Sequence, residues 1–358
     1  MGRIIGIVVV LVLAAAGAGY FLVPPVAARS QTVEIERPAQ TILARLASTP
    51  ADTVVVEGVT TTAAATQDDN TVSAPVSYAD GGAGRVVYTV TPAGEGARVE
   101  VKLEQNLGSN PMDRLAIITG GDVAPLIEAA ATSVSTDLTA LPNATWDGLT
   151  YVVEEVTARP FFYVENCSDT SSESITSIIT QATAAIPAVM RTNNLQTNGE
   201  LMAVEPRVVS NQYCYQVGYP YSGRQPRALL IGKTGQTPAG QVLRVNYTGT
   251  EADVVAQVYD RFDALLGAAH LDNPATREDD WITYEVYHDD ATQAGGSRNR
   301  DIYYVVPAGV DIARVTSIAP PAQSLTPAAA PAEAGATPAP ATPAPATPAP
   351  ATPAPATP

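Results

Sequence analysis

Cations and metal-ligating side chains are scarce in this sequence. The 358 residues carry 20 Lys and Arg against 36 Asp and Glu, a net charge of −16, and Lys and Arg never occur in a run. Nucleic-acid binding depends on clustered cations that neutralise phosphates, so the composition argues against a nucleic-acid partner. Only two cysteines and two histidines are present, without zinc-ligand spacing, and we expect no metal site.

Catalytic signatures are also missing. The sequence contains no G-x-S-x-G, no P-loop and no G-x-G-x-x-G, and neither histidine is placed for a catalytic triad. We therefore assign no catalytic residue and no cofactor. This absence favours a binding protein over an enzyme.

A long apolar run stands near the beginning. Residues 4–23, "IIGIVVVLVLAAAGAGYFLV", are twenty consecutive uncharged residues, enough for a helix to cross a hydrocarbon core of roughly 30 Å. Segment 1–30 is thus predicted to be a transmembrane anchor. The predicted location is the bacterial inner membrane, single-pass, with the domains facing the periplasm. A cleaved signal peptide is the alternative, because "VAA" at 26–28 offers small residues for cleavage.

The other end is rich in Pro, Ala and Thr. Over residues 309–358, "ATPAP" repeats every five residues from Ala336 onward. Such a tract has little to bury and favours extended polyproline II, so we predict a disordered tail. Contact with an envelope protein or the cell wall is the alternative use.

Residues 31–141 predict a first domain. A short strand and a helix are followed by several strands, of which "ARVEVKLE" (97–104) alternates strictly between apolar and charged residues. An amphipathic helix over 123–141 closes the segment. This order, with the turn "SNPMDR" (109–114), resembles the polyketide cyclase/START-like (SRPBCC) superfamily. The resemblance implies an α+β helix-grip fold. Residues 142–147 are predicted to be a linker.

Residues 148–308 contain an internal repeat. Segments 151–220 and 232–306 each follow the order β-α-β-β, and such units are expected to pair around a pseudo-twofold axis. The segment resembles the GyrI-like effector-binding domain, also known from the C-terminal halves of AraC- and MerR-type regulators. The matching pieces are "TARPFFYV", "YQVGYP", "AGQVLRVNYTGTEADVVAQVYDRFDALL", "ITYEVYHDD" and "DIYYVV". A START-like domain followed by a GyrI-like one behind a membrane anchor resembles a recurrent bacterial arrangement.

That resemblance implies a binding site. In the GyrI-like family an acid on the last strand lies in the cleft between the repeats and faces cationic or amphipathic molecules, and Asp301 stands at that position. Aromatics surround it in sequence, since twelve of the fifteen Tyr lie at or beyond residue 151, and aromatic faces attract cations. The predicted ligand-binding residues are Asp301, Tyr303, Glu285, Tyr287, Trp281 and Tyr215.

The sequence leaves alternatives at this site. Asp301 could instead pair with Arg298 or Arg300 at an exposed strand edge, and Glu285 is a second candidate for the pocket acid. Some GyrI-like proteins are hydrolases of reactive small molecules that use a pocket acid, so this activity stays open. A non-catalytic envelope adaptor is a further possibility.

Cys167 and Cys214 each fall inside a segment that reads as a strand. In an exported protein they could form one disulfide, with a single possible connectivity. Two reduced, buried cysteines are the alternative.

Overall fold

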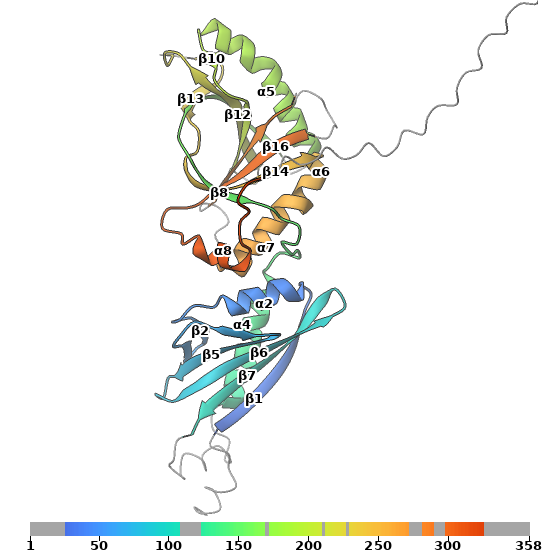
Figure 1. Ribbon diagram of the computed structural model, residues 1–358, viewed down its shortest axis with the longest axis vertical. Helices are drawn as coiled ribbons and strands as arrows, with labels where there is room; N and C mark the ends of the chain where they lie inside the picture. Colours follow the sequence, from blue (N-terminus) through green and yellow to red (C-terminus); the bar gives the residue numbers. More distant parts are fainter. Residues whose placement is uncertain are drawn as a thin grey trace, which may run out of the picture.

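Two antiparallel sheets follow one another along the chain, each packed against helices (Figure 1). The architecture is α+β with curled sheets, consistent with a helix-grip-like fold, and this part of the predicted fold class is confirmed. The computed structural model describes residues 26–107, 123–168, 172–209, 212–226, 229–271, 281–289 and 298–325.

The first sheet has the strand order β1-β7-β6-β5-β3-β2, with β4 paired to β5. The alternation in β7 buries Val99, Val101 and Leu103 completely, and α4 packs in the same core through Ala130 and Leu138. The strands are β1 (Val26–Ile35), β2 (Val54–Val56), β3 (Val59–Thr61), β4 (Thr66–Asp68), β5 (Thr71–Tyr78), β6 (Ala83–Ala93) and β7 (Gly96–Asn106), and the helices are α2 (Ala39–Ala47) and α4 (Val123–Thr139).

The second sheet has the strand order β13-β9-β12-β11-β15-β16-β14-β8, with β10 paired to β12. Its strands are β8 (Val152–Val156), β9 (Pro160–Ser168), β10 (Gln196–Thr197), β11 (Leu201–Val209), β12 (Gln212–Ser222), β13 (Lys233–Gln236), β14 (Gly240–Gly249), β15 (Ile282–Tyr287) and β16 (Arg298–Val305). Its helical segments are α5 (Ser172–Thr192), α6 (Glu251–Val254), the π-helical η1 (Val255–Tyr259), α7 (Asp260–Ala268) and α8 (Ala313–Ile318).

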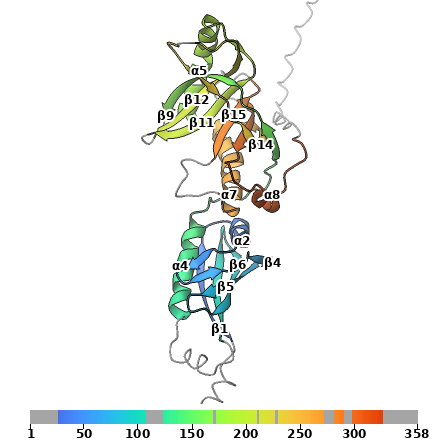
Figure 2. The ribbon, with the colours of Figure 1, turned by 90° about the vertical axis from the view of Figure 1, so that its left-hand side faces the viewer.

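Two short connections bring the edges of this sheet together. Residues 157–159 join β8 to β9, and residues 237–239 join β13 to β14, although β8 and β13 lie at opposite ends of the strand order. The connections bond to each other: the Thr237 amide donates to the Arg159 carbonyl at 2.9 Å, and the Arg159 amide donates to Thr237 Oγ1 at 3.0 Å. The sheet therefore curls into a half-barrel (Figure 2).

Curling gives the second sheet two different faces. On one, which we call the helix face, side chains pack against α5 and α7. On the other, the inner face, six residues from five strands form a separate buried cluster. These residues are Phe161, Met202, Val204, Val242, Tyr284 and Val305.

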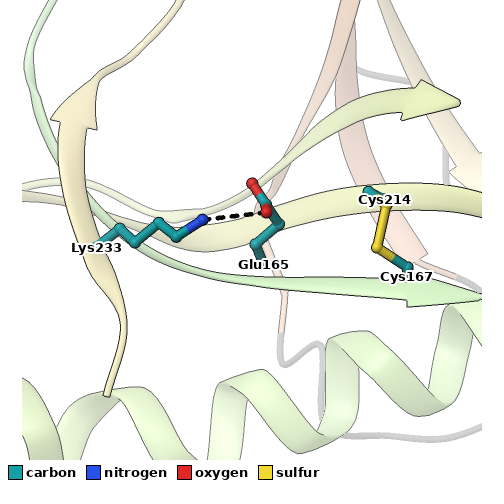
Figure 3. Close-up of a disulfide and its surroundings, with 4 residues drawn as sticks. All are labelled: Glu165, Cys167, Cys214 and Lys233. Carbon is teal, nitrogen blue, oxygen red and sulfur yellow. Dashed lines mark hydrogen bonds and ion pairs between the residues drawn. A yellow bond between two sulfur atoms is a disulfide. The ribbon is translucent and has the colours of Figure 1, made fainter. Parts of the chain in front are cut away.

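The two cysteines lie directly opposite each other on β9 and β12, where Cys167 and Cys214 form a disulfide (Figure 3). Two positions earlier on β9, Glu165 pairs with Lys233 of β13 at 3.1 Å. The disulfide and the ion pair thus link three neighbouring strands of the second sheet, β13, β9 and β12.

The folded part of the chain begins earlier and ends later than predicted. The strand β1 begins at Val26, inside the predicted anchor segment 1–30, because Ala27 packs in the first core. At the other end the predicted tail 309–358 begins too early. Val315 of α8 is fully buried, and the amide of Ala322 donates to the Tyr151 carbonyl at 2.8 Å. The rest of the tail, from residue 326, lies outside the described residues.

The predicted membrane location is corrected. None of the helices in the described part of the chain combines the length and apolar character that crossing a membrane requires. This finding contradicts the single-pass inner-membrane location with periplasmic domains. The apolar run itself, residues 4–23, lies outside the described residues.

The two halves meet where α2 and α7 end. Arg45 of α2 donates to the carbonyl of Gly267 at 2.7 Å, and the Ser48 hydroxyl donates to the carbonyl of Ala268. The last carbonyls of a helix have no partner within the helix and carry partial negative charge, so these donors stabilise the C-terminus of α7. Asp137 of α4 holds the Arg45 guanidinium at 2.6 Å. We call these contacts the junction.

His270 adds a pH-dependent contact to the junction. Its Nε2 lies 2.8 Å from the Arg45 carbonyl, and burial, followed by the charge of Arg45, lowers its pKa from 6.5 to about 4. The unfolded chain therefore takes up a proton below about pH 6.5, whereas the folded chain resists it until about pH 4. The resulting stability is fully present above pH 6.5 and is lost as the pH falls toward 4.

We expect the free energy of unfolding to fall by at most about 3 kcal/mol across that window because of His270 alone. Denaturant unfolding of the wild-type chain and of His270→Gln, followed between pH 7 and pH 5, measures the effect. The difference between the two proteins should change with pH in this range. A constant difference would contradict it.

Removing the disulfide should also destabilise the second half. The bridge spans a sequence separation of 47 residues, and we expect Cys167→Ser/Cys214→Ser to lower the free energy of unfolding by about 2–4 kcal/mol. Denaturant titrations under non-reducing conditions test this. Adding reductant should bring the wild type to the level of the variant, and equal midpoints for the oxidised wild type and the variant would refute the expectation.

Candidate functional site

The predicted binding residues are divided between the two faces of the second sheet. Successive side chains of a strand point to opposite faces, and on β16 Ile302 and Tyr304 pack in the cluster of α7. Tyr303 packs against the inner-face cluster. Asp301 lies two positions from Tyr303 on the same strand and therefore points to the inner face as well. Glu285 of β15, in contrast, points to the helix face.

Four of the predicted residues lie on the helix face. Tyr215 and Tyr287 are buried in the cluster around α5, and Trp281 packs against the cluster around α7. Glu285 is only 8% exposed. The sequence could not show this separation, because the strand boundaries and their register decide which residues share a face.

Glu285 has its own set of partners on the helix face. Its Oε2 accepts from Arg300 at 3.0 Å and from the Tyr287 hydroxyl at 2.5 Å, and its Oε1 accepts from the Tyr259 hydroxyl at 2.8 Å. The Arg300 side chain is fully buried and also donates to the Gly249 carbonyl at 3.2 Å. A buried ion pair whose members make further hydrogen bonds is the arrangement that offsets part of the cost of desolvation.

On the inner face, Asp301 lies at the centre of a row of alternating acids and bases. Its Oδ2 is 3.1 Å from Arg244 Nη1 and 3.2 Å from His288 Nε2. Arg244 continues to Glu154, with Nε 2.9 Å from Oε1, and His288 continues to Glu200, with Nδ1 2.9 Å from Oε2. We call these five side chains the ion-pair row.

The ion-pair row runs from solvent into the protein and out again. The Asp301 side chain is 10% exposed, whereas Glu154 and Glu200 at the two ends are 34% and 51% exposed. Three carboxylates face one guanidinium and one imidazole, so the row carries a net charge of −2 when the imidazole is neutral and −1 when it is charged. Either way the row has an excess of negative charge.

The alternative pairing of Asp301 is also settled by the register. β16 is an interior strand between β15 and β14, so Asp301 does not lie at an exposed sheet edge. Its cationic partner comes from the adjacent strand β14, as Arg244. The Asn246 amide, directly opposite on the same strand, donates to Asp301 Oδ1 at 2.8 Å.

An aromatic pair lies beside the ion-pair row. Tyr284 and Tyr303 stack with ring centroids 4.4 Å apart and planes 5° apart. Burial, followed by the nearby charge of Asp301, raises the pKa of Tyr303. Burial and then the neighbouring Tyr303 raise the pKa of Tyr284. Both phenols are therefore neutral at physiological pH. The Tyr284 residue is buried, whereas Tyr303 is partly exposed.

Sequence reasoning missed four members of the ion-pair row: Arg244, His288, Glu154 and Glu200. Arg244 carried a usable indication, because it is a charged residue within the apolar strand "QVLRVNY", just as Asp301 is within its own strand. Figure 1 shows β14 beside β16, the adjacency that brings the two together. His288 and Glu200 adjoin the ends of β15 and β11, and Glu154 lies in the middle of the short edge strand β8, so sequence gives little guide to their register.

Other parts of the described chain are weaker candidates for a binding site. A surface hollow of about 300 Å³ near the end of α5 is lined by Asn193, Asn194, Arg224, Gln225 and Pro226, and contains none of the predicted residues. Within the described residues, no group of three or more His, Cys, Asp and Glu side chains is placed to hold a metal ion.

No family model and no curated protein matches the chain. Solved structures similar to it include SAV2435 bound to tetraphenylphosphonium, with 10% identity and a TM-score of 0.33, covering 45% of this chain and 95% of that one. The C-terminal domain of EcmrR has 15% identity and a TM-score of 0.32, covering 44% of this chain and 96% of that one.

A third similar structure extends over both halves. It is the di-domain ARO/CYC BexL from the BE-7585A biosynthetic pathway, with 10% identity and a TM-score of 0.24, covering 81% of this chain and 92% of that one. At these values the similarity assigns neither a family nor a ligand.

Asp301 should be structurally important whatever the site binds. In Asp301→Asn the charged partner of Arg244 and His288 is lost while the side-chain shape is kept, and we expect the free energy of unfolding to fall by about 1–3 kcal/mol. Asp68→Asn, at an exposed position of β4, is the matched control and should be nearly neutral. Denaturant unfolding of both variants measures this, and equal effects would show that the ion-pair row contributes no stability.

Proposed function

We propose that this protein binds a small organic cation on the inner face of the second sheet, next to Asp301. The observation that supports this most is the excess of carboxylates in the ion-pair row beside the stacked rings of Tyr284 and Tyr303. We propose residues 148–308, together with α8, as the binding unit, and residues 31–141 as a separate domain.

The charge of the row favours a cation over an anion or a neutral molecule. Arg244 and His288 hold Asp301 in place, so its carboxylate does not need a ligand to be compensated. The excess negative charge is shared along the row, whose outer carboxylates, Glu154 and Glu200, are its most exposed members. A cation entering from solvent meets these first, and the partly buried setting strengthens the attraction relative to bulk water.

The aromatic pair favours an organic cation over an inorganic one. A cation positioned over a Tyr face contributes roughly 0.5–2 kcal/mol, with the larger values when the contact is desolvated. Apolar side chains of the inner-face cluster adjoin the pair, among them Val286 and Met202. An amphipathic cation suits the carboxylates, the aromatic pair and the apolar cluster together. Its charge faces the carboxylates and the rings, while its apolar groups cover the cluster.

The predicted residues then take different parts. Asp301 and Tyr303 contact the ligand, while Glu285, Tyr287, Trp281 and Tyr215 support the sheet from its helix face. A similar solved structure contains tetraphenylphosphonium, which makes this bulky cation a suitable first probe for the present chain. Spermidine provides a cation without aromatic groups, and triphenylphosphine oxide a neutral compound of related shape.

We expect calorimetric titration of the purified chain to show binding of tetraphenylphosphonium but not of triphenylphosphine oxide. Asp301→Asn should weaken cation binding by on the order of 1–3 kcal/mol, the range for a hydrogen bond or contact to a charged group. Glu154→Gln should weaken it as well, with less effect on folding because Glu154 lies at the solvent end of the row.

Asp68→Asn serves as the control for a lost negative charge elsewhere on the chain, and all titrations are made well below the unfolding temperature. Unchanged affinity in both Asp301→Asn and Glu154→Gln would eliminate the ion-pair row as the binding site. Conversion of the bound probe into products would instead favour the hydrolase that the sequence left open.

A further inference from the structure

One helical run reaches from the buried acid on the helix face to the junction between the two halves. α6, η1 and α7 follow one another without a break from Glu251 to Ala268, and the middle five residues, Val255–Tyr259, are π-helical. π-helical segments are rare and are often found at functional sites. A helix keeps such a segment only where other contacts outweigh its poorer hydrogen bonding.

The first such contact is made by the last residue of the π-helical segment. Tyr259 donates its hydroxyl to Glu285 Oε1 at 2.8 Å, and its ring lies 6.1 Å from that of Tyr304. Glu285 is fixed in turn by Arg300 and Tyr287 on the strands. Tyr259 thus ties the middle of the helical run to the sheet at a defined rotation.

The second contact is the junction at the other end of the run. The carbonyls of Gly267 and Ala268 accept from Arg45 and Ser48 of the first half. Because Asp137 also holds Arg45, the end of α7 is fixed in rotation as well. The helical run is therefore clamped at two places that belong to different structural units.

The geometry points to a negative energetic coupling between these two clamps. An α-helix has 3.6 residues per turn, so changing the register of the run by one residue rotates one clamp relative to the other by roughly 100°. If the π-helical segment relaxed to a regular α-helix, Tyr259 could not reach Glu285 while α7 kept its contacts with α2. We propose that both clamps together hold the segment in its π-helical register, each against strain imposed by the other.

This coupling has a consequence for regulation. Anything that takes Glu285 away from Tyr259 releases the helical run, which relaxes and binds the first half more tightly at the junction. Loosening the junction has the reciprocal effect on the Tyr259–Glu285 contact, as linkage requires. The proposal concerns the helix face and does not depend on cation binding at Asp301.

The sign of the coupling can be measured by a double-mutant cycle with hydrogen exchange as the readout. The variants are Tyr259→Phe, Arg45→Met and the two combined, and the quantity is the opening constant of α7 amides in a peptide covering 260–268. Each single variant removes a contact but also relieves strain, whereas the double variant relieves the same strain only once. The double variant should therefore open more than the product of the single effects, by on the order of 2- to 30-fold.

Tyr163→Phe, which removes a hydroxyl from the inner face, is the matched control and should combine with Arg45→Met multiplicatively. If Arg45→Met does not fold, Ser48→Ala takes its place, since it removes only one bond of the junction. The proposal would be overturned if the effect of the double variant on the opening constant lay within about twofold of the product of the two single effects. It would also be overturned if the double variant opened less than that product.

Discussion

The buried carboxylate of Asp301 has to be compensated, and much of the second sheet's organisation follows from how this is done. An unpaired charge in an apolar strand would be expensive. Here Arg244 comes from the neighbouring strand, His288 from the end of β15, and Asn246 from the position directly opposite. These partners exist only when β14, β15 and β16 are adjacent in the observed register. The compensation therefore selects the register as well as stabilising the acid.

The same strand shows how one sheet holds two charged centres without mixing them. Asp301 faces the inner side with the ion-pair row, and its neighbour Arg300 faces the helices, where it pairs with Glu285. One centre reaches solvent at both ends and has an excess of carboxylates. The other is closed, with a fully buried guanidinium. The open centre is therefore the better candidate for a ligand, and the closed one for holding helices and sheet in a fixed relation.

Much of the fold could be predicted from the sequence, because periodicity records burial. The alternation of β7 and the stripe of α4 are visible in the residue pattern and match the observed elements. The order β-α-β-β predicted for each repeat is incomplete, because the first predicted strand divides into two, β8 and β9 in one case and β13 and β14 in the other. The chain ends were predicted less well. β1 has an irregular burial pattern and α8 is short, and only their packing, through Ala27 and Val315, shows that they belong to the cores.

The site was predicted only in part. Composition and resemblance suggested Asp301 and several tyrosines as candidates, but they combined residues from opposite faces, because a list of residues on neighbouring strands does not specify register. The location in the inner membrane rested on the apolar run alone and is contradicted by the helices that the described chain contains. In both cases the sequence showed a local pattern but not where that pattern lies in the folded structure.

A crystal structure of the chain with tetraphenylphosphonium tests the central claim most directly. The account predicts the cation on the inner face, with its phosphorus within about 6 Å of the Tyr284 or Tyr303 ring, as cation–π contact requires, and on the side of Glu154 or Asp301. Density for the cation on the helix face beside Glu285, or in the hollow lined by Asn193 and Arg224, would contradict it.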